Sequence, residues 1–130
     1  MLFKYAIMQM FFREGLARIG KFKTPHGEIE TPTVMPVINP NLNFLSEQDL
    51  KSLGVQAVIT NSYIIKRTPS LEEKALKEGL HRLINFDGPI MTDSGTFQSY
   101  VYGDIEYNNK EIVEFQKKIG SDIITILDIF

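Results

Sequence analysis

Hydrophobic and polar positions along the chain change their rhythm near residue 32. Before that point, runs rich in aromatic and β-branched residues occupy positions 3–8, 17–22 and 28–31, and the turn-prone stretches 13–15 (Arg-Glu-Gly) and 25–27 (Pro-His-Gly) separate them. Closely spaced strands joined by short turns are typical of an antiparallel meander. The pattern therefore predicts a small antiparallel sheet at the front of the chain.

After residue 32, apolar runs typical of buried strands alternate with helical patterns. Helices are expected to open near Ser46, Pro69 and Asn109, where capping residues or a favourable proline precede an apolar stripe, and a glycine follows each helix. This alternation is typical of βα units that feed a parallel sheet, so an α/β fold is predicted. The predicted strands lie at 34–38, 55–60, 89–93 and 122–127.

Polar residues recur where each of these predicted strands ends. In barrels and open α/β sheets, ligands bind at the carboxyl ends of the strands, so this placement predicts a functional rim. The stretch 93–98 (Asp-Ser-Gly-Thr-Phe-Gln) puts an acid, a hydroxyl, a glycine, an aromatic ring and an amide close together. A tight turn at 93–95, with Asp and Gly chosen for backbone reasons, is the alternative. The strand-end residues are Asn39, Asn61, Ser62, Asp93, Ser94 and Asp128.

Composition narrows the classes of protein that fit. The chain has 130 residues, 43% hydrophobic and 23% charged, which is typical of one globular domain rather than a disordered segment. Its formal net charge of −2 indicates that any RNA contact is local. Cysteine is absent, which excludes disulfides and thiolate metal sites, and His26 is interpreted as a structural turn residue without a ligand partner at local spacing.

No targeting or membrane segment is expected. The first 12 residues are interrupted by Lys4 and Gln9 and lack the pattern of a signal peptide. No apolar run approaches the ~18 residues that a membrane span needs. A soluble cytoplasmic protein without a membrane partner is the expectation.

The stretch 93–98 resembles the Asp-Ser-Gly-x-aromatic-Gln motif of the tRNA-guanine transglycosylases. Asn-Ser-Tyr-Ile-Ile at 61–65 and Met-Pro-Val-Ile-Asn-Pro at 35–40 are more similar to the archaeal branch, which inserts the 7-deazaguanine preQ0 into the D-arm of tRNA in archaeosine biosynthesis. Further segments that match the family in order and spacing are 17–21, 30–32, 35–37, 60–63, 79–81 and 119–123.

The resemblance implies a more specific fold than the hydrophobic pattern alone predicts. It implies an irregular (β/α)8 TIM barrel preceded by a small antiparallel β-sheet. The front sheet is expected over about residues 1–32, and the first βα units of the barrel over 33–130. A complete barrel needs about 250 residues, so the chain is expected to be the N-terminal portion of one incomplete catalytic domain.

The resemblance also implies a base exchange at ribose C1′ of tRNA. An aspartate displaces guanine, and the incoming deazaguanine then displaces the enzyme, which divides one substitution into two steps. The roles carried over by motif are general acid/base for Asp93, base reading for Asp128, stacking for Phe97, pocket lining for Ser94 and Gln98, and support of the carboxylates for Asn61. From the residues alone, Phe97 could instead be ordinary core and Gln98 a structural bridge.

Three parts of the family pattern have no match in this chain: the nucleophilic aspartate, the zinc site of three cysteines and a histidine, and the modules that grip tRNA. No cofactor is therefore expected within this chain, the family's zinc site is expected beyond residue 130, and the 130 residues alone are expected to be inactive. The expected partners are tRNA and a guanine or 7-deazaguanine base, with self-association or pairing with a C-terminal half through open sheet edges.

Two other functions remain open at this stage. The chain could be a non-catalytic, purine-binding half-barrel or a subunit of a split enzyme. It could also belong to a different barrel enzyme that uses Asp93 and Asp128 as a hydrolytic acid pair.

Overall fold

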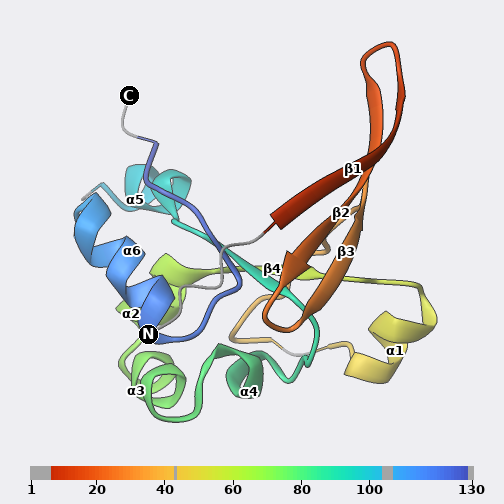
Figure 1. Cartoon of the computed structure of the whole chain (residues 1–130). Helices are drawn as coiled ribbons and strands as arrows, with labels where there is room; N and C mark the ends of the chain where they lie inside the picture. Colours follow the sequence, from red (N-terminus) through yellow and green to blue (C-terminus); the bar gives the residue numbers. More distant parts are fainter. Residues whose placement is uncertain (1–6, 43, 104–106, 129–130) are drawn as a thin grey trace.

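The computed structural model describes residues 7–42, 44–103 and 107–128 as a mixed α/β protein with two sheets (Figure 1). In the described residues, no helix is long and apolar enough to cross a membrane. The antiparallel sheet consists of β1 (Ile7–Glu14), β2 (Ala17–Thr24) and β3 (Gly27–Thr31), and the parallel sheet of β4 (Val58–Asn61), β5 (Ile90–Asp93) and β6 (Ile123–Ile124).

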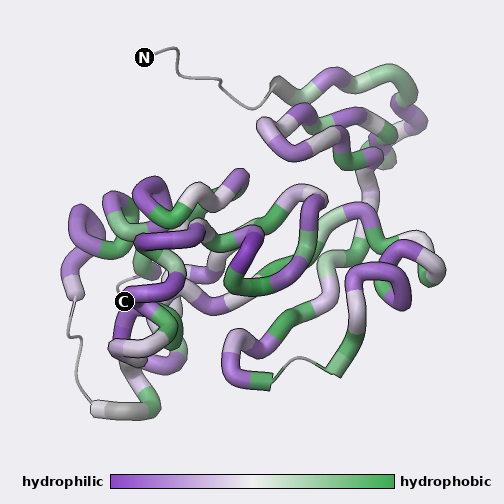
Figure 2. The backbone as a smooth tube through the Cα atoms, turned by 90° about the horizontal axis from the view of Figure 1, so that it is seen from below, coloured by the Kyte–Doolittle hydropathy of each residue, from purple (hydrophilic) through white to green (hydrophobic). Residues whose placement is uncertain are grey.

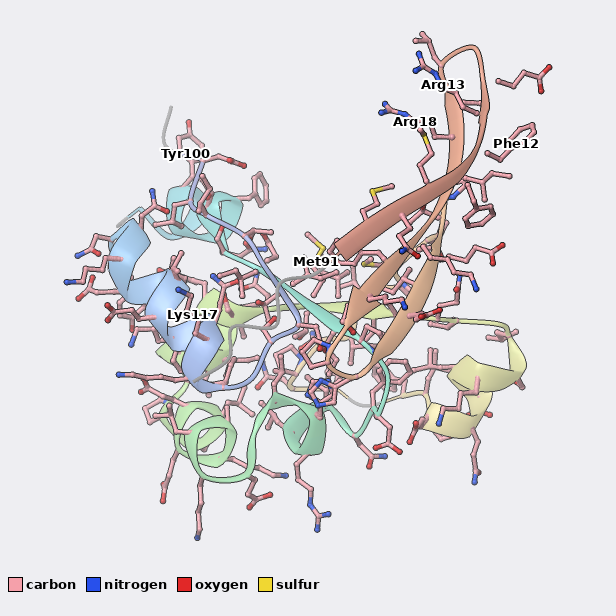
Figure 3. All side chains as sticks on the ribbon, viewed as in Figure 1. Phe12, Arg13, Arg18, Met91, Tyr100 and Lys117 are labelled. Atoms are coloured by element: carbon pink, nitrogen blue, oxygen red, sulfur yellow. The ribbon has the colours of Figure 1, made fainter. Side chains whose placement is uncertain are left out.

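The predicted antiparallel front sheet is confirmed, with a shifted first turn. β1 and β2 pair up to Glu14↔Ala17, so the loop is Gly15-Leu16 rather than 13–15. Gly15 has φ +57°, and a glycine with positive φ at the first loop position suits the twist of a two-residue hairpin. Residues 3–6 of the first predicted strand lie outside the described residues. The hairpin projects away from the helices, and Phe12, Arg13 and Arg18 extend from it into open space (Figure 3).

Helices cover the parallel sheet, and the three predicted ones are present. Capping boxes at Ser46 and Asn108 begin two of them, because each side chain accepts the N–H three residues on while an acid reaches back to the cap. Three further short helices were not predicted, because five to seven residues carry little periodicity and none of the three begins with a capping box. The helices are α1 (Glu47–Ser52), α2 (Ser62–Arg67), α3 (Pro69–Glu78), α4 (Leu80–Ile84), α5 (Thr96–Tyr102) and α6 (Asn109–Lys118).

The prediction of a buried strand at 34–38 is wrong. Val34 and Val37 are 82% and 77% exposed, and Val37 makes only an isolated parallel bridge to Ile59. Pro36 has no N–H to donate, which limits this segment to a short edge contact. The strand predicted at 122–127 is also shorter, since ladder pairing stops after β6.

The hydrophobic core lies between the parallel sheet and its helices. The strands run in the chain order β4-β5-β6, each parallel to the last. Hydrophobic stretches also continue along the hairpin, outside this core (Figure 2). The core cluster comprises Ile38, Leu50, Val58, Ile65, Ala75, Leu80, Ile84, Phe86, Ile90, Phe115 and Ile119.

Candidate active site at the strand ends

Asp93 is the last residue of β5, and its carboxylate is oriented by the neighbouring strand. Asn61 ends β4 directly beside it, and the Asn61 Nδ2 donates to Asp93 Oδ2 at 3.0 Å. The other end of the same amide, Asn61 Oδ1, accepts the Ile64 N–H at 2.9 Å and caps α2. Because both ends of the amide are occupied, its donor side is fixed toward the acid. Ser62 Oγ also donates to the Asp93 carbonyl at 2.7 Å.

The turn after Asp93 needs its glycine. Gly95 has φ +81°, and a Cβ built on it would lie 2.2 Å from the Tyr63 Cβ. Ser94, before it, is buried, and its N–H donates to Thr125 Oγ1 at 2.7 Å. Backbone geometry thus accounts for Gly95, as the turn interpretation supposed. Backbone geometry does not account for the Asp93 carboxylate, which is hydrogen-bonded to Asn61 on the neighbouring strand β4.

An aromatic ring and an amide lie on α5, directly after this turn. Phe97 is 72% exposed, so its interpretation as ordinary core is wrong. Gln98 has a buried Oε1 without a hydrogen-bond partner among the described residues. A buried acceptor left unpaired is costly, so this oxygen is unusual among the described residues. Tyr100, farther along α5, points outward at the same end of the molecule (Figure 3).

Asp128 lies at the same end of the sheet as Asp93. It follows β6, and β6 runs parallel to β5, so both acids come after the carboxyl ends of neighbouring strands. The Asp128 N–H donates to Thr96 Oγ1 at 2.9 Å, which brings its backbone to the first residue of α5. The Asp128 side chain is exposed. The structure therefore brings all six sequence-predicted residues to one rim: Asn61, Asp93, Ser94, Phe97, Gln98 and Asp128.

A second polar cluster lies at the opposite end of the parallel sheet. His26 Nδ1 is 2.8 Å from Asp122 Oδ1, His81 Nε2 is 3.1 Å from Asp122 Oδ2, and the two imidazole rings stack at 3.6 Å. The Ile90 N–H donates to the same carboxylate at 2.9 Å. His26 lies in the β2–β3 turn, as predicted, but its partner Asp122 was not predicted. Local spacing gave no signal, because its acid lies 96 residues away.

The Asp122 carboxyl is buried and held in its charged form. Burial is the largest influence and by itself would raise its pKa, but hydrogen bonds from His81, the Ile90 N–H and His26 outweigh it, so the pKa lies below its ordinary value.

The cluster's shape suits hydrogen bonding better than metal binding. A metal ion lies near the plane of an imidazole that binds it, whereas these rings are stacked with only 23° between their planes. His81 Nε2 also faces the Gly88 carbonyl at 3.1 Å, which can only accept, so this nitrogen carries a proton. His26 lies in the turn between β2 and β3, so the cluster fastens the front sheet to the parallel sheet.

Comparison with known proteins gives consistent matches. Residues 13–130 match the family model described as queuine tRNA-ribosyltransferase. The chain is similar to proteins named tRNA-guanine(15) transglycosylase from Picrophilus torridus (79% identical over 123 residues), Thermoplasma acidophilum (69% over 123) and Methanosarcina mazei (57% over 124). Each match covers 95% of this chain and 20% or 25% of the relative. The chain thus spans about a fifth to a quarter of the length of these curated relatives.

Proposed function

The chain belongs to the queuine tRNA-ribosyltransferase family, and from this membership we propose that it forms the first part of a tRNA-guanine transglycosylase. The proposed reaction exchanges guanine in tRNA for a 7-deazaguanine such as preQ0, by double displacement at ribose C1′, as in archaeosine biosynthesis. The observation that carries the proposal is the shared location of Asp93, Asp128 and Phe97 at the carboxyl ends of parallel strands.

Asp93 is proposed as the general acid/base for the leaving and entering base. Proton transfer on a purine-like ring needs a carboxyl group that is positioned before the substrate arrives. The hydrogen bond from Asn61 supplies that orientation without neutralising the acid. The half-buried position of Asp93 leaves it open toward the rim.

Asp128, Phe97 and Gln98 are proposed to bind the base. A carboxylate accepts two parallel hydrogen bonds from the amino and ring N–H groups of a guanine edge, and the exposed Asp128 side chain is free to do so. Phe97 offers an exposed ring for stacking. Gln98 and Ser94 are proposed to line the same pocket.

The barrel is part of the same proposal. The three described strands of the parallel sheet lie side by side in chain order, as successive strands of a barrel do. This order supports a front sheet at about 1–32 followed by the first βα units of an irregular (β/α)8 barrel at 33–130. The proposed nucleophile and zinc site are supplied by other parts of the enzyme, since this chain has no cysteine and nothing in it matches the family's nucleophile.

The 130 residues by themselves are therefore expected to give no base exchange. The proposed partners are tRNA, a guanine or 7-deazaguanine base, and either a C-terminal half or a second copy paired through open strand edges. Exposed apolar side chains such as Val34, Val37 and Phe12 support such pairing.

A chimera tests the proposal. This chain would replace the matched N-terminal segment of the Picrophilus torridus relative, which is 79% identical. The chimera is expected to incorporate labelled guanine into tRNA. A chimera with Glu73→Gln, which changes an exposed acid on α3, is expected to do so at the same rate. A chimera that melts cooperatively, binds tRNA and incorporates no label would overturn the proposal. If it bound guanine without exchange, a non-catalytic purine-binding role would be favoured instead.

A further inference from the structure

The segment that carries Asp128 is held by side chains rather than by a β-ladder. Pairing between β5 and β6 ends at Thr92↔Ile124. One residue later, the side-chain amide of Gln116 on α6 forms hydrogen bonds with both the N–H and the carbonyl of Thr125. Gln116 Oε1 accepts the Thr125 N–H at 3.2 Å, and Gln116 Nε2 donates to the Thr125 carbonyl at 2.8 Å. A neighbouring strand would offer the same pair of groups.

Asn109, at the other end of α6, repeats this contact two residues farther on. Its Oδ1 accepts the Leu127 N–H at 2.6 Å, and its Nδ2 lies 3.5 Å from the Leu127 carbonyl, which makes the first bond the strong one. Asn109 and Gln116 are seven positions apart, so they share one face of the helix. Thr125 and Leu127 are two positions apart, so they share one edge of an extended segment. The two amides of α6 therefore act in place of a strand along residues 125–127.

Gln116 also reaches the strand that ends in Asp93. The Thr92 Oγ1 donates to Gln116 Oε1 at 2.6 Å, and Thr92 directly precedes Asp93. Thr125 Oγ1 completes the link, since it donates to the Thr92 carbonyl at 3.1 Å and accepts the Ser94 N–H at 2.7 Å. Gln116 is fully buried, so no solvent could replace these bonds if its amide were lost. One buried side chain thus joins the strand of Asp93 to the segment that leads to Asp128.

From these contacts we infer that Gln116 and Asn109 are positioning residues that hold Asp128 in register with Asp93. Neither residue is among those proposed to bind the base. A slip of residues 125–128 by one position would turn the Asp128 side chain to the other face, because side chains alternate along an extended segment. Asp128 has an exposed side chain, so its direction depends on the backbone contacts before it and on the Thr96 bond. The link between α6 and base reading rests on the proposed function.

A matched pair of substitutions at Asn109 tests the placement without any assay of activity. Asn109→Ala removes the acceptor for the Leu127 N–H, whereas Asn109→Asp keeps an acceptor there and suits the first turn of a helix. Amide hydrogen exchange in the 130-residue chain is expected to be about tenfold faster at Leu127 in Asn109→Ala and unchanged in Asn109→Asp. Equal exchange at Leu127 in both variants and the parent would overturn the placement.

Kinetics in the chimera test the effect on base reading. Asn109→Ala and Gln116→Met are expected to raise KM for guanine about tenfold with a smaller effect on kcat. Asn109→Asp is expected to leave KM at the value of the parent chimera. An unchanged KM in a variant whose Leu127 exchanges faster would overturn the positioning role. If the parent chimera were inactive, the proposed function would fail, while the exchange rates at Leu127 would still decide the placement.

Discussion

At the scale of single residues, the turn between β5 and α5 depends on the absence of a Cβ atom at Gly95. A Cβ on Gly95 would meet Tyr63 at 2.2 Å, and the φ of +81° is unfavourable for other residues. Gly95→Ala is therefore expected to lower the free energy of unfolding by at least about 2 kcal/mol, through backbone strain and overpacking together. Urea denaturation followed by circular dichroism would measure the loss.

Gly103 provides the control for this substitution. Its φ of +84° is similar, but a Cβ there would meet no atom of the described residues within 4 Å. Gly103→Ala should then cost only the backbone term, about 1 kcal/mol. Equal losses in the two variants would contradict the close approach of Tyr63 to the turn.

Which residues lie at the rim could be predicted from the sequence, but their contacts could not. The end of a strand is visible locally, because an apolar run stops and a polar residue follows, as at Asp93 and Asp128. The bond from Asn61 to Asp93 depends on which strands are neighbours. Gln116 lies on a helix that was predicted from its cap and apolar stripe, but a buried amide that hydrogen-bonds like a neighbouring strand leaves no periodic signal. The roles of all six rim residues stay predictions.

At the scale of elements, the capping box of α1 predicts a dependence on pH. The hydrogen bonds of the Ser46 side chain and backbone hold the pKa of Asp49 below its ordinary value. Because the folded-state pKa is lowered, the box stabilises α1 fully above the ordinary pKa of an aspartate and loses that contribution as the pH falls through the folded-state value. Titration by NMR should give Asp49 a midpoint below the ordinary value of an aspartate, with the Ser46 amide signal shifting in parallel.

Ser46→Ala is the matched variant for that titration. It removes the hydroxyl that binds the Asp49 carboxylate and leaves the charge in place. The Asp49 midpoint should then move up toward its ordinary value. A midpoint that is the same in both proteins would mean that the box does not form in solution.

Which elements form was easier to predict than how long they are. The existence of α1, α3 and α6 follows from capping residues, an early proline and apolar stripes, whereas α2, α4 and α5 are short and begin without a capping box. The segment 34–38 reads as a buried strand because it is apolar, yet burial depends on what covers it. In the described structure, Val34 and Val37 face outward.

At the scale of the whole molecule, Asp122 is expected to fix the front sheet in place. Its buried carboxylate receives His26 from the β2–β3 turn and His81 from α4. Asp122→Asn removes the charge and one acceptor, and should lower the free energy of unfolding by about 2–3 kcal/mol. Urea denaturation measures this loss, with Glu73→Gln as the control at an exposed site. Identical midpoints for the two variants would contradict the fastening role.

The central claim is that Asp93 transfers protons in a base exchange that needs the rim described above. Its most direct test is the rate of labelled-guanine incorporation into tRNA by the chimera, with and without Asp93→Asn. The substitution keeps an acceptor for Asn61, so the fold should survive and the rate should fall about 100-fold or more. A folded Asp93→Asn chimera that exchanges guanine as fast as its parent would contradict the claim.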